Sequence, residues 1–224
     1  MQNQKFKIPY SKSFLEFSLP PSMQVTIAVS QPTEPLQDVS AAIKEALDHP
    51  IGTPPLRELA HPGDRVCIVF TDITRSTPDD LLVPALLAEL EKAGVSDENI
   101  TLLCGIGMHR PSTQEEKVIK LGADIVRRYR VIDSEPQNPA ALVDLGVTPG
   151  GVPVLLHRSV VEADLVIATG IVEPHQYAGY SGGRKTVAIG AAGEALIAYT
   201  HGPNFVDHPA TRLGQGVWGR YIPN

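Results

Sequence analysis

Side chains capable of acid–base chemistry gather in three segments of the sequence, each directly after an apolar run. The segments cover residues 71–75, 104–111 and 170–186, and the functional groups in them are Asp72, Arg75, His109, His175 and Lys185. If the apolar runs are parallel neighbouring strands, their carboxyl ends share one edge of a sheet, where open α/β folds bind ligands. The sequence therefore predicts a cleft there, with histidines that could transfer protons and an arginine that could bind an anion.

The third segment contains a glycine pair, Gly182-Gly183, shortly before Lys185. It is not a P-loop, because Arg184 stands where that motif requires glycine immediately before the lysine. A glycine pair that enters a helix still presents backbone N–H groups, which suits a phosphate. The alternative interpretation is a simple glycine turn beside a solvated lysine.

The histidines do not form a recognisable zinc motif. No two of them have the i, i+4 spacing of a helical metal site, and no cysteine accompanies them. Taken singly, a histidine is more often a structural residue than a catalyst. Asp72 could equally be a helix N-cap and Arg75 a surface charge. The joint placement of His109 and His175 after predicted strands is what favours a functional site.

The elements that must position these residues alternate between strand and helix. Strands are expected at 14–19, 24–29, 66–70, 99–103, 129–132 and 164–169, a hairpin over 145–156, and helices at 36–47, 54–60, 78–93, 112–121, 160–162 and 183–199. Thr77 is the expected N-cap of the helix over 78–93, with Pro78 as its first residue. This order predicts an α/β fold with a doubly wound, mainly parallel, Rossmann-like sheet, helices on both faces, and additional N-terminal β segments.

Composition excludes several classes of protein. The 224 residues carry 19 Lys and Arg against 25 Asp and Glu, a net charge of −6, and 42% are apolar, which excludes intrinsic disorder. The acidic balance argues against a broad basic surface for nucleic acid or anionic lipid. No apolar run approaches the ~18 residues that cross a bilayer. Cys67 and Cys104 lie in apolar runs and predict buried free thiols rather than a disulfide framework. We expect a cytoplasmic protein that binds neither nucleic acid nor membrane.

Taken together, the segments resemble the nickel-dependent lactate racemase family, over roughly residues 65–213. The matching pieces are Asp72-Ile-Thr-Arg75, Gly107-Met-His109-Arg-Pro111, Glu173-Pro-His175, Ala178-Gly-Tyr-Ser-Gly-Gly183, Lys185 and Thr200-His201-Gly202. The resemblance implies a nickel-pincer nucleotide, a pyridinium mononucleotide with two sulfur substituents that hold nickel, covalently attached to Lys185. It implies His201 as a nickel ligand and His109 and His175 as the two acid–base residues.

The same resemblance implies that Asp72, Gly182 and Gly183 contact the cofactor and that Arg75 binds the substrate carboxylate. The implied reaction is racemisation or epimerisation of small 2-hydroxy acids by reversible proton-coupled hydride transfer, and the implied partners are the cofactor-biosynthesis enzymes. Either histidine could serve either enantiomer.

We expect residues 1–213 to form the cofactor-binding N-terminal domain and 214–224 an irregular tail. We also expect the family's second α/β domain to be absent from this chain, and a separate chain could supply it. Two other functions stay open. The chain could be a non-catalytic cofactor-binding half, or a zinc-dependent hydrolase that uses His109, His175 and His201.

Overall fold

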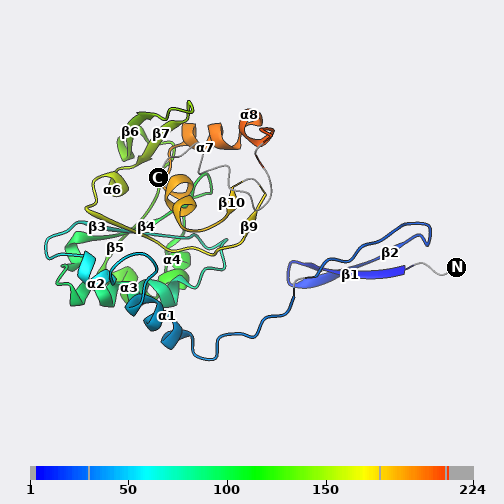
Figure 1. Cartoon of the computed structure of the whole chain (residues 1–224), viewed down its shortest axis with the longest axis horizontal. Helices are drawn as coiled ribbons and strands as arrows, with labels where there is room; N and C mark the ends of the chain where they lie inside the picture. The colour runs from blue at the N-terminus through cyan, green and yellow to red at the C-terminus, as the bar shows by residue number, and fades with distance from the viewer. Residues whose placement is uncertain (1–3, 30, 177, 210, 212–224) are drawn as a thin grey trace. The chain divides into compact units, whose positions relative to one another are not determined.

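The computed structural model describes residues 4–29, 31–176, 178–209 and 211 (Figure 1). The chain divides into two compact units, residues 1–37 and 38–224. The predicted irregular tail, 214–224, lies outside the described residues. No helix among the described residues is long and apolar enough to span a membrane.

The N-terminal unit contains a β-hairpin. β1 (Gln4–Tyr10) pairs antiparallel with β2 (Ser13–Leu19), and Phe6 stacks on Phe17 with ring centroids 5.7 Å apart. The prediction of a strand over 14–19 is confirmed, but that of a strand over 24–29 is wrong. The partner strand precedes β2 instead, because a tight turn at Ser11, with φ of +52°, sends the chain straight back.

The second unit contains a four-stranded parallel sheet in the order β5-β4-β3-β8. Its strands are β3 (Val66–Phe70), β4 (Ile100–Cys104), β5 (Arg130–Asp133) and β8 (Leu165–Ala168). β3 therefore lies between β4 and β8, so the carboxyl ends of the three strands that precede the candidate segments are adjacent. The expectation of a shared sheet edge is confirmed.

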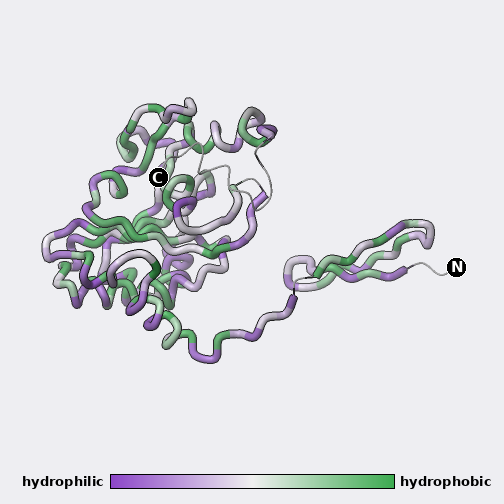
Figure 2. The backbone as a smooth tube through the Cα atoms, in the orientation of Figure 1, coloured by the Kyte–Doolittle hydropathy of each residue, from purple (hydrophilic) through white to green (hydrophobic). Residues whose placement is uncertain are grey.

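Helices and loops cover both faces of this sheet, because β3 is apolar on both. Val66, Ile68 and Phe70 pack toward one face, and Cys67 and Val69 toward the other. Figure 2 shows the strands as a hydrophobic band within more polar surroundings. The first face packs against α2 (Leu56–Leu59), α3 (Asp79–Lys92), α4 (Gln114–Leu121) and α5 (Ala123–Arg128). The second packs against α6 (Arg158–Val161) and η3 (Thr186–Gly190). The predicted α/β class, with helices on both faces, is confirmed.

Shorter elements complete the unit. They are α1 (Val39–Asp48), which packs on α3, with η1 (Asp97–Asn99), η2 (Pro139–Ala141) and α8 (Pro203–Val206). The predicted hairpin is present as β6 (Leu142–Val147) and β7 (Pro153–His157). Both cysteines are buried and free, as expected.

Two helix predictions need correction. α3 begins at Asp79 with Pro78 at the N-cap position, so Thr77 is not its cap, and no side chain caps the helix. The helix predicted over 183–199 is interrupted, since η3 ends at Gly190 and α7 (Glu194–His201) starts afresh. Between them the chain lies against the β6–β7 hairpin, where the Gly193 N–H donates to the Leu155 carbonyl at 2.9 Å.

Candidate functional site

A cavity of about 370 Å³ lies at the carboxyl ends of β3, β4 and β8. Segments from all three predicted clusters line it. Of the residues singled out from the sequence, those that line it are Asp72, Arg75, His109, His175, Gly182, Lys185 and His201. Gly183 is not among the lining residues. The fold thus brings together side chains that are more than 100 residues apart in the sequence, such as Asp72 and His201.

Asp72 and His109 form a hydrogen-bonded pair across the ends of β3 and β4. The Asp72 Oδ2 lies 2.5 Å from His109 Nδ1, and Oδ1 accepts from the Thr74 N–H at 2.9 Å and from its hydroxyl at 2.5 Å. Burial alone would raise the pKa of Asp72, but the hydrogen bonds from Thr74 and His109 outweigh it and hold this pKa below its ordinary value. An ionised Asp72 accepts the proton on Nδ1, which leaves the lone pair of neutral His109 on Nε2. This is the arrangement of a general base that is oriented by a carboxylate.

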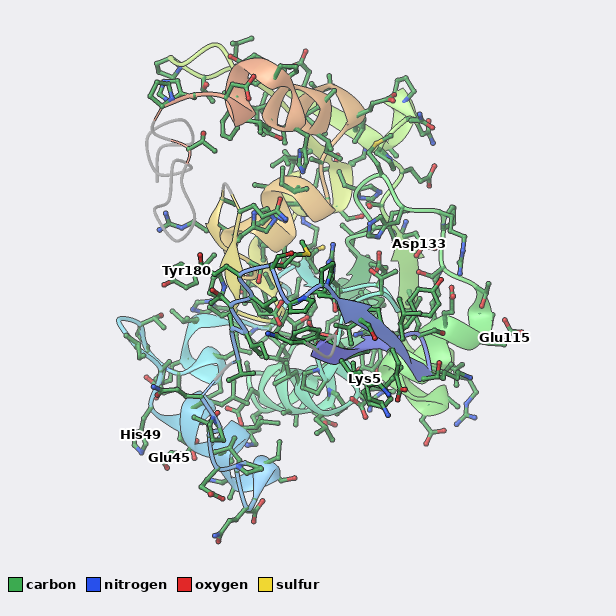
Figure 3. The ribbon with its side chains drawn as sticks, turned by 90° about the vertical axis from the view of Figure 1, so that its right-hand side faces the viewer. Lys5, Glu45, His49, Glu115, Asp133 and Tyr180 are labelled. Atoms are coloured by element: carbon green, nitrogen blue, oxygen red, sulfur yellow. The ribbon has the colours of Figure 1, made fainter. Side chains whose placement is uncertain are left out.

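His175 lies on a small hairpin that is fastened at its base. β9 (Pro174–His175) pairs with β10 (Gly179–Tyr180), whose Tyr180 side chain is exposed (Figure 3). Below the pair, the Ser181 hydroxyl donates to the Ile171 carbonyl at 2.6 Å and accepts from the Glu173 N–H at 3.0 Å. The sequence motif around His175 therefore folds as a clamped turn that presents the imidazole to the cavity.

The ring of His175 has a defined environment. Its Nδ1 accepts from the Ala178 N–H at 3.2 Å, which places the proton of the neutral ring on Nε2. Burial lowers the pKa of His175, and the positive charges of Lys185, His201 and Arg75 lower it further. His109 and His175 thus present opposite tautomers to the cavity, one with an Nε2 lone pair and one with an Nε2 proton.

Lys185 is half-buried and precedes η3 directly. Burial lowers the pKa of its amine, and the nearby Arg75 guanidinium lowers it further. A lowered pKa raises the neutral, nucleophilic fraction of an amine at a given pH. Lys185 is therefore suited to covalent attachment.

His201 ends α7 with its ring oriented by the helix itself. Its Nδ1 lies 2.9 Å from the Ile197 carbonyl oxygen and 3.1 Å from the Thr200 hydroxyl. Because a carbonyl only accepts, Nδ1 carries the proton and Nε2 the lone pair, the orientation that metal-binding histidines commonly show. Burial lowers the pKa of His201, which favours the neutral ring that a metal requires.

Two glycines allow the chain to fold tightly at the cavity wall. A Cβ on Gly182, whose φ is +73°, would lie 2.8 Å from the Ile171 carbonyl oxygen. A Cβ on Gly170 would lie 2.8 Å from the Thr186 hydroxyl and 2.9 Å from Gly182 Cα. These contacts give both glycines a steric reason to be glycine, in addition to any contact with a ligand.

Comparison with known proteins decides the family. Residues 10–214 match the family described as the lactate racemase N-terminal domain. The chain belongs to this family. It is 35% identical over 210 residues to a lactate racemase of Thermoanaerobacterium thermosaccharolyticum, which covers 93% of this chain and 49% of that protein. It is 37% identical over 172 residues to a lactate racemase of Lactiplantibacillus plantarum, covering 77% of this chain and 40% of that protein.

Solved structures give the same result. The structure of the lactate racemase apoprotein from T. thermosaccharolyticum superposes with a TM-score of 0.80 at 33% identity, over 94% of this chain and 49% of that one. A crystal structure of a Thermotoga maritima protein matches with a TM-score of 0.63 at 26% identity, over 79% of this chain and 44% of that one. The chain thus spans about half the length of the relatives that it matches.

The structure of this lactate racemase N-terminal domain does not support the alternative function, a zinc-dependent hydrolase. In the part of the chain that the structure describes, no three His, Cys, Asp or Glu residues are grouped so as to hold a metal ion. His109, His175 and His201 line a common cavity without converging on one point as a protein-only metal site would require.

Sequence reasoning missed several residues at and beneath the cavity. Thr71, Ser181 and Thr186 line it, and Asp79 and Lys120 form a buried ion pair that contacts Thr71 below. Thr71 and Ser181 could have been suspected, because both lie within segments that the sequence analysis singled out. Thr71, in addition, directly follows β3. No local signal identifies Lys120, which shares its helix with the similar Lys117.

Proposed function

We propose that this chain binds a nickel-pincer nucleotide in the cavity and forms the cofactor-binding part of a racemase or epimerase of small 2-hydroxy acids such as lactate. The observation that carries the proposal is the gathering of His109, His175, Lys185 and His201 around one cavity in a member of the lactate racemase N-terminal domain family. The cofactor-binding role is assigned to residues 1–213.

The residues present fit such a cofactor. The cavity volume of about 370 Å³ lies within the ~300–1,000 Å³ of small-molecule sites. Lys185, with its lowered pKa, would form the covalent link, and His201 would ligate nickel through Nε2, since imidazole is a suitable nickel ligand. The tight turn at Gly182, and the adjacent Gly183, would accommodate the phosphate. When bound, the cofactor supplies an acceptor for the hydride on the substrate C2 carbon.

The chain's own side chains would bind the substrate and move its hydroxyl proton. Arg75 would hold the carboxylate through a bidentate ion pair. His109 would accept the hydroxyl proton on Nε2, while the Asp72 carboxylate stabilises the imidazolium that results. Removing this proton during hydride loss avoids a carbanion at C2.

The planar 2-keto acid that forms can be reduced from either face. One histidine would remove the hydroxyl proton of one enantiomer and become an imidazolium. The other, protonated beforehand from solvent, would give a proton to the oxygen as the opposite enantiomer forms and return to its neutral state, while the first would release its extra proton to solvent. Running the reaction backward exchanges these roles, so both His109 and His175 are required for racemisation.

Partners follow from the same proposal. Enzymes of cofactor biosynthesis would have to supply the nucleotide, because nothing in the proposed chemistry makes it. Since the matched relatives are about twice as long as this chain, a second α/β domain would cover the cavity and exclude water.

The test is coexpression of the 224-residue chain with the cofactor-making enzymes, followed by intact-mass analysis. The wild-type chain and a Lys5→Ala control are expected to carry the same added mass, and Lys185→Ala none. An unmodified wild-type chain would overturn the covalent-cofactor proposal.

Chiral chromatography of L-lactate incubated with the modified chain, with and without the second domain of a relative, tests the reaction itself. Formation of D-lactate supports the racemase proposal. A modified chain that never interconverts the enantiomers would identify a cofactor-binding half without racemase activity.

A further inference from the structure

A buried ion pair lies directly beneath the cavity and has no part in the chemistry proposed above. Lys120 of α4 places its Nζ 2.8 Å from Oδ2 of Asp79, the first residue of α3, and the two side chains are 7% and 0% exposed. Burying such a pair is costly unless additional hydrogen bonds satisfy both groups. Its hydrogen-bond partners therefore indicate what it does.

The Asp79 carboxylate joins the ends of two neighbouring strands. Its Oδ2 accepts from the Thr71 hydroxyl at 2.7 Å, and its Oδ1 accepts from the Thr169 hydroxyl at 2.5 Å. Thr71 follows β3 and Thr169 follows β8. One carboxylate thus fixes the points at which two of the site-bearing segments leave the sheet.

The Lys120 ammonium holds the segment that begins at Thr71. It donates to the Thr77 carbonyl at 2.8 Å, the Arg75 carbonyl at 3.2 Å and the Thr71 hydroxyl at 3.2 Å. All three acceptors belong to residues 71–77. Between these anchor points lie the Asp72 carboxylate, which contacts His109, and the Arg75 side chain, which enters the cavity lining.

We propose that Lys120 and Asp79 are positioning residues that hold the 71–77 segment so that Asp72 can orient His109 and Arg75 can reach the cavity. The roles of Asp72 and Arg75 rest on the proposed function, whereas the positioning itself does not. An ammonium suits this task because its three protons can donate hydrogen bonds to several oxygens of one segment, which no apolar side chain of similar length can do.

α4 offers a closely matched control. Lys117, one helical turn before Lys120, is paired with Asp133 at 2.7 Å, with side chains 13% and 12% exposed. Asp133, labelled in Figure 3, ends β5, so this pair also joins α4 to the carboxyl edge of the sheet. Lys117 thus binds the end of β5, whereas Lys120 binds the 71–77 segment. Lys120→Met and Lys117→Met therefore remove the same group from the same helix.

The experiment is amide hydrogen exchange by NMR on the 224-residue chain without cofactor. The Thr74 N–H donates to Asp72 Oδ1 and the Arg75 N–H to the Asp72 carbonyl, so both report the conformation of the segment. In Lys120→Met we expect both amides to exchange roughly tenfold faster or more, as loss of a charge-assisted hydrogen bond predicts. In Lys117→Met we expect both to keep their wild-type rates.

The ¹⁵N shifts of the His109 ring supply a second readout, because they show which nitrogen carries the proton. Wild-type and Lys117→Met chains should hold it on Nδ1, and Lys120→Met should show a mixture of tautomers. Unchanged exchange and an unchanged tautomer in a folded Lys120→Met chain would overturn the proposal, as would equal effects of the two lysine variants.

If Lys120→Met does not fold, Asp79→Asn carries the test, since it keeps the shape of the side chain and removes the charge that faces Lys120. The same selective loss of protection is expected. If Asp79→Asn leaves the segment unchanged, or unfolds while Lys117→Met folds, the pair serves global stability and the proposal is overturned. None of these measurements needs the cofactor, so their outcome is independent of the mass and racemase assays.

Discussion

Two adjacent glycines, of which Gly182 lines the cavity and Gly183 does not, are expected to respond very differently to alanine. Gly182 and Gly183 both have left-handed backbone, with φ of +73° and +51°. Their surroundings differ, since a Cβ on Gly182 would lie 2.8 Å from the Ile171 carbonyl oxygen and 3.3 Å from its carbon. A Cβ on Gly183 would have no atom within 4 Å. Comparing Gly182→Ala with Gly183→Ala therefore separates two contributions to the loss of folding free energy, the left-handed backbone conformation and the steric overlap of the new Cβ.

The expected magnitudes follow from these two terms. A left-handed backbone costs a non-glycine residue about 1–2 kcal/mol, which both variants share. In Gly182→Ala alone, the new Cβ would lie 2.8 Å from the Ile171 carbonyl oxygen. This overpacking adds a cost of about 1–3 kcal/mol. We thus expect Gly183→Ala to lower the free energy of unfolding by about 1–2 kcal/mol and Gly182→Ala by about 2–5 kcal/mol.

Urea titration followed by far-UV circular dichroism measures both values against the wild-type chain. Because the Ile171 carbonyl also accepts the Ser181 hydroxyl that fastens the β9–β10 hairpin, Gly182→Ala should additionally broaden or shift the ring resonances of His175. Equal losses of stability in the two variants would refute the argument from steric contact.

Three further predictions concern titratable groups. Arg75→Met should slow the acylation of Lys185 near neutral pH, because loss of the guanidinium raises the Lys185 pKa; peptide mapping measures this, and an unchanged rate would contradict it. The pKa values of His157, His175 and His201 lie below the ordinary 6.5, so below that pH the unfolded chain binds more protons and the folded chain loses stability. Thermal melting across this range should show a falling midpoint as pH decreases, and a midpoint that rises would be inconsistent with these shifts. Burial raises the pKa of the Cys67 and Cys104 thiols to about 12, so iodoacetamide should label both in urea and neither in the folded chain, whereas labelling of the folded chain would show that these thiols are accessible.

Much of the fold could be predicted because β3 has a simple pattern. Five consecutive apolar residues, Val66–Phe70, are typical of a strand covered on both faces, and such a strand is central in an α/β sheet. Segments that follow such strands must meet at one edge, which is why the lining of the cavity by Asp72, His109 and His175 was predictable from their order alone.

Other features depend on tertiary contacts that local sequence does not record. Lys117 and Lys120 look alike in sequence, and only packing of α4 against the sheet distinguishes them. The helix start at Asp79 differs from the predicted one at Pro78 because Asp79 is held by Thr71 and Thr169 from distant strands. The missed strand β1 alternates lysines with apolar residues and finds its partner only through the turn at Ser11.

The most direct test of the central claim is to locate the cofactor on the chain by tandem mass spectrometry after coexpression with the cofactor-making enzymes. We predict an added mass on Lys185 and on no other lysine, and the loss of copurified nickel, with that added mass retained, in His201→Ala. An added mass on another residue, or nickel binding that is unaffected in His201→Ala, would contradict the assignment of this cavity.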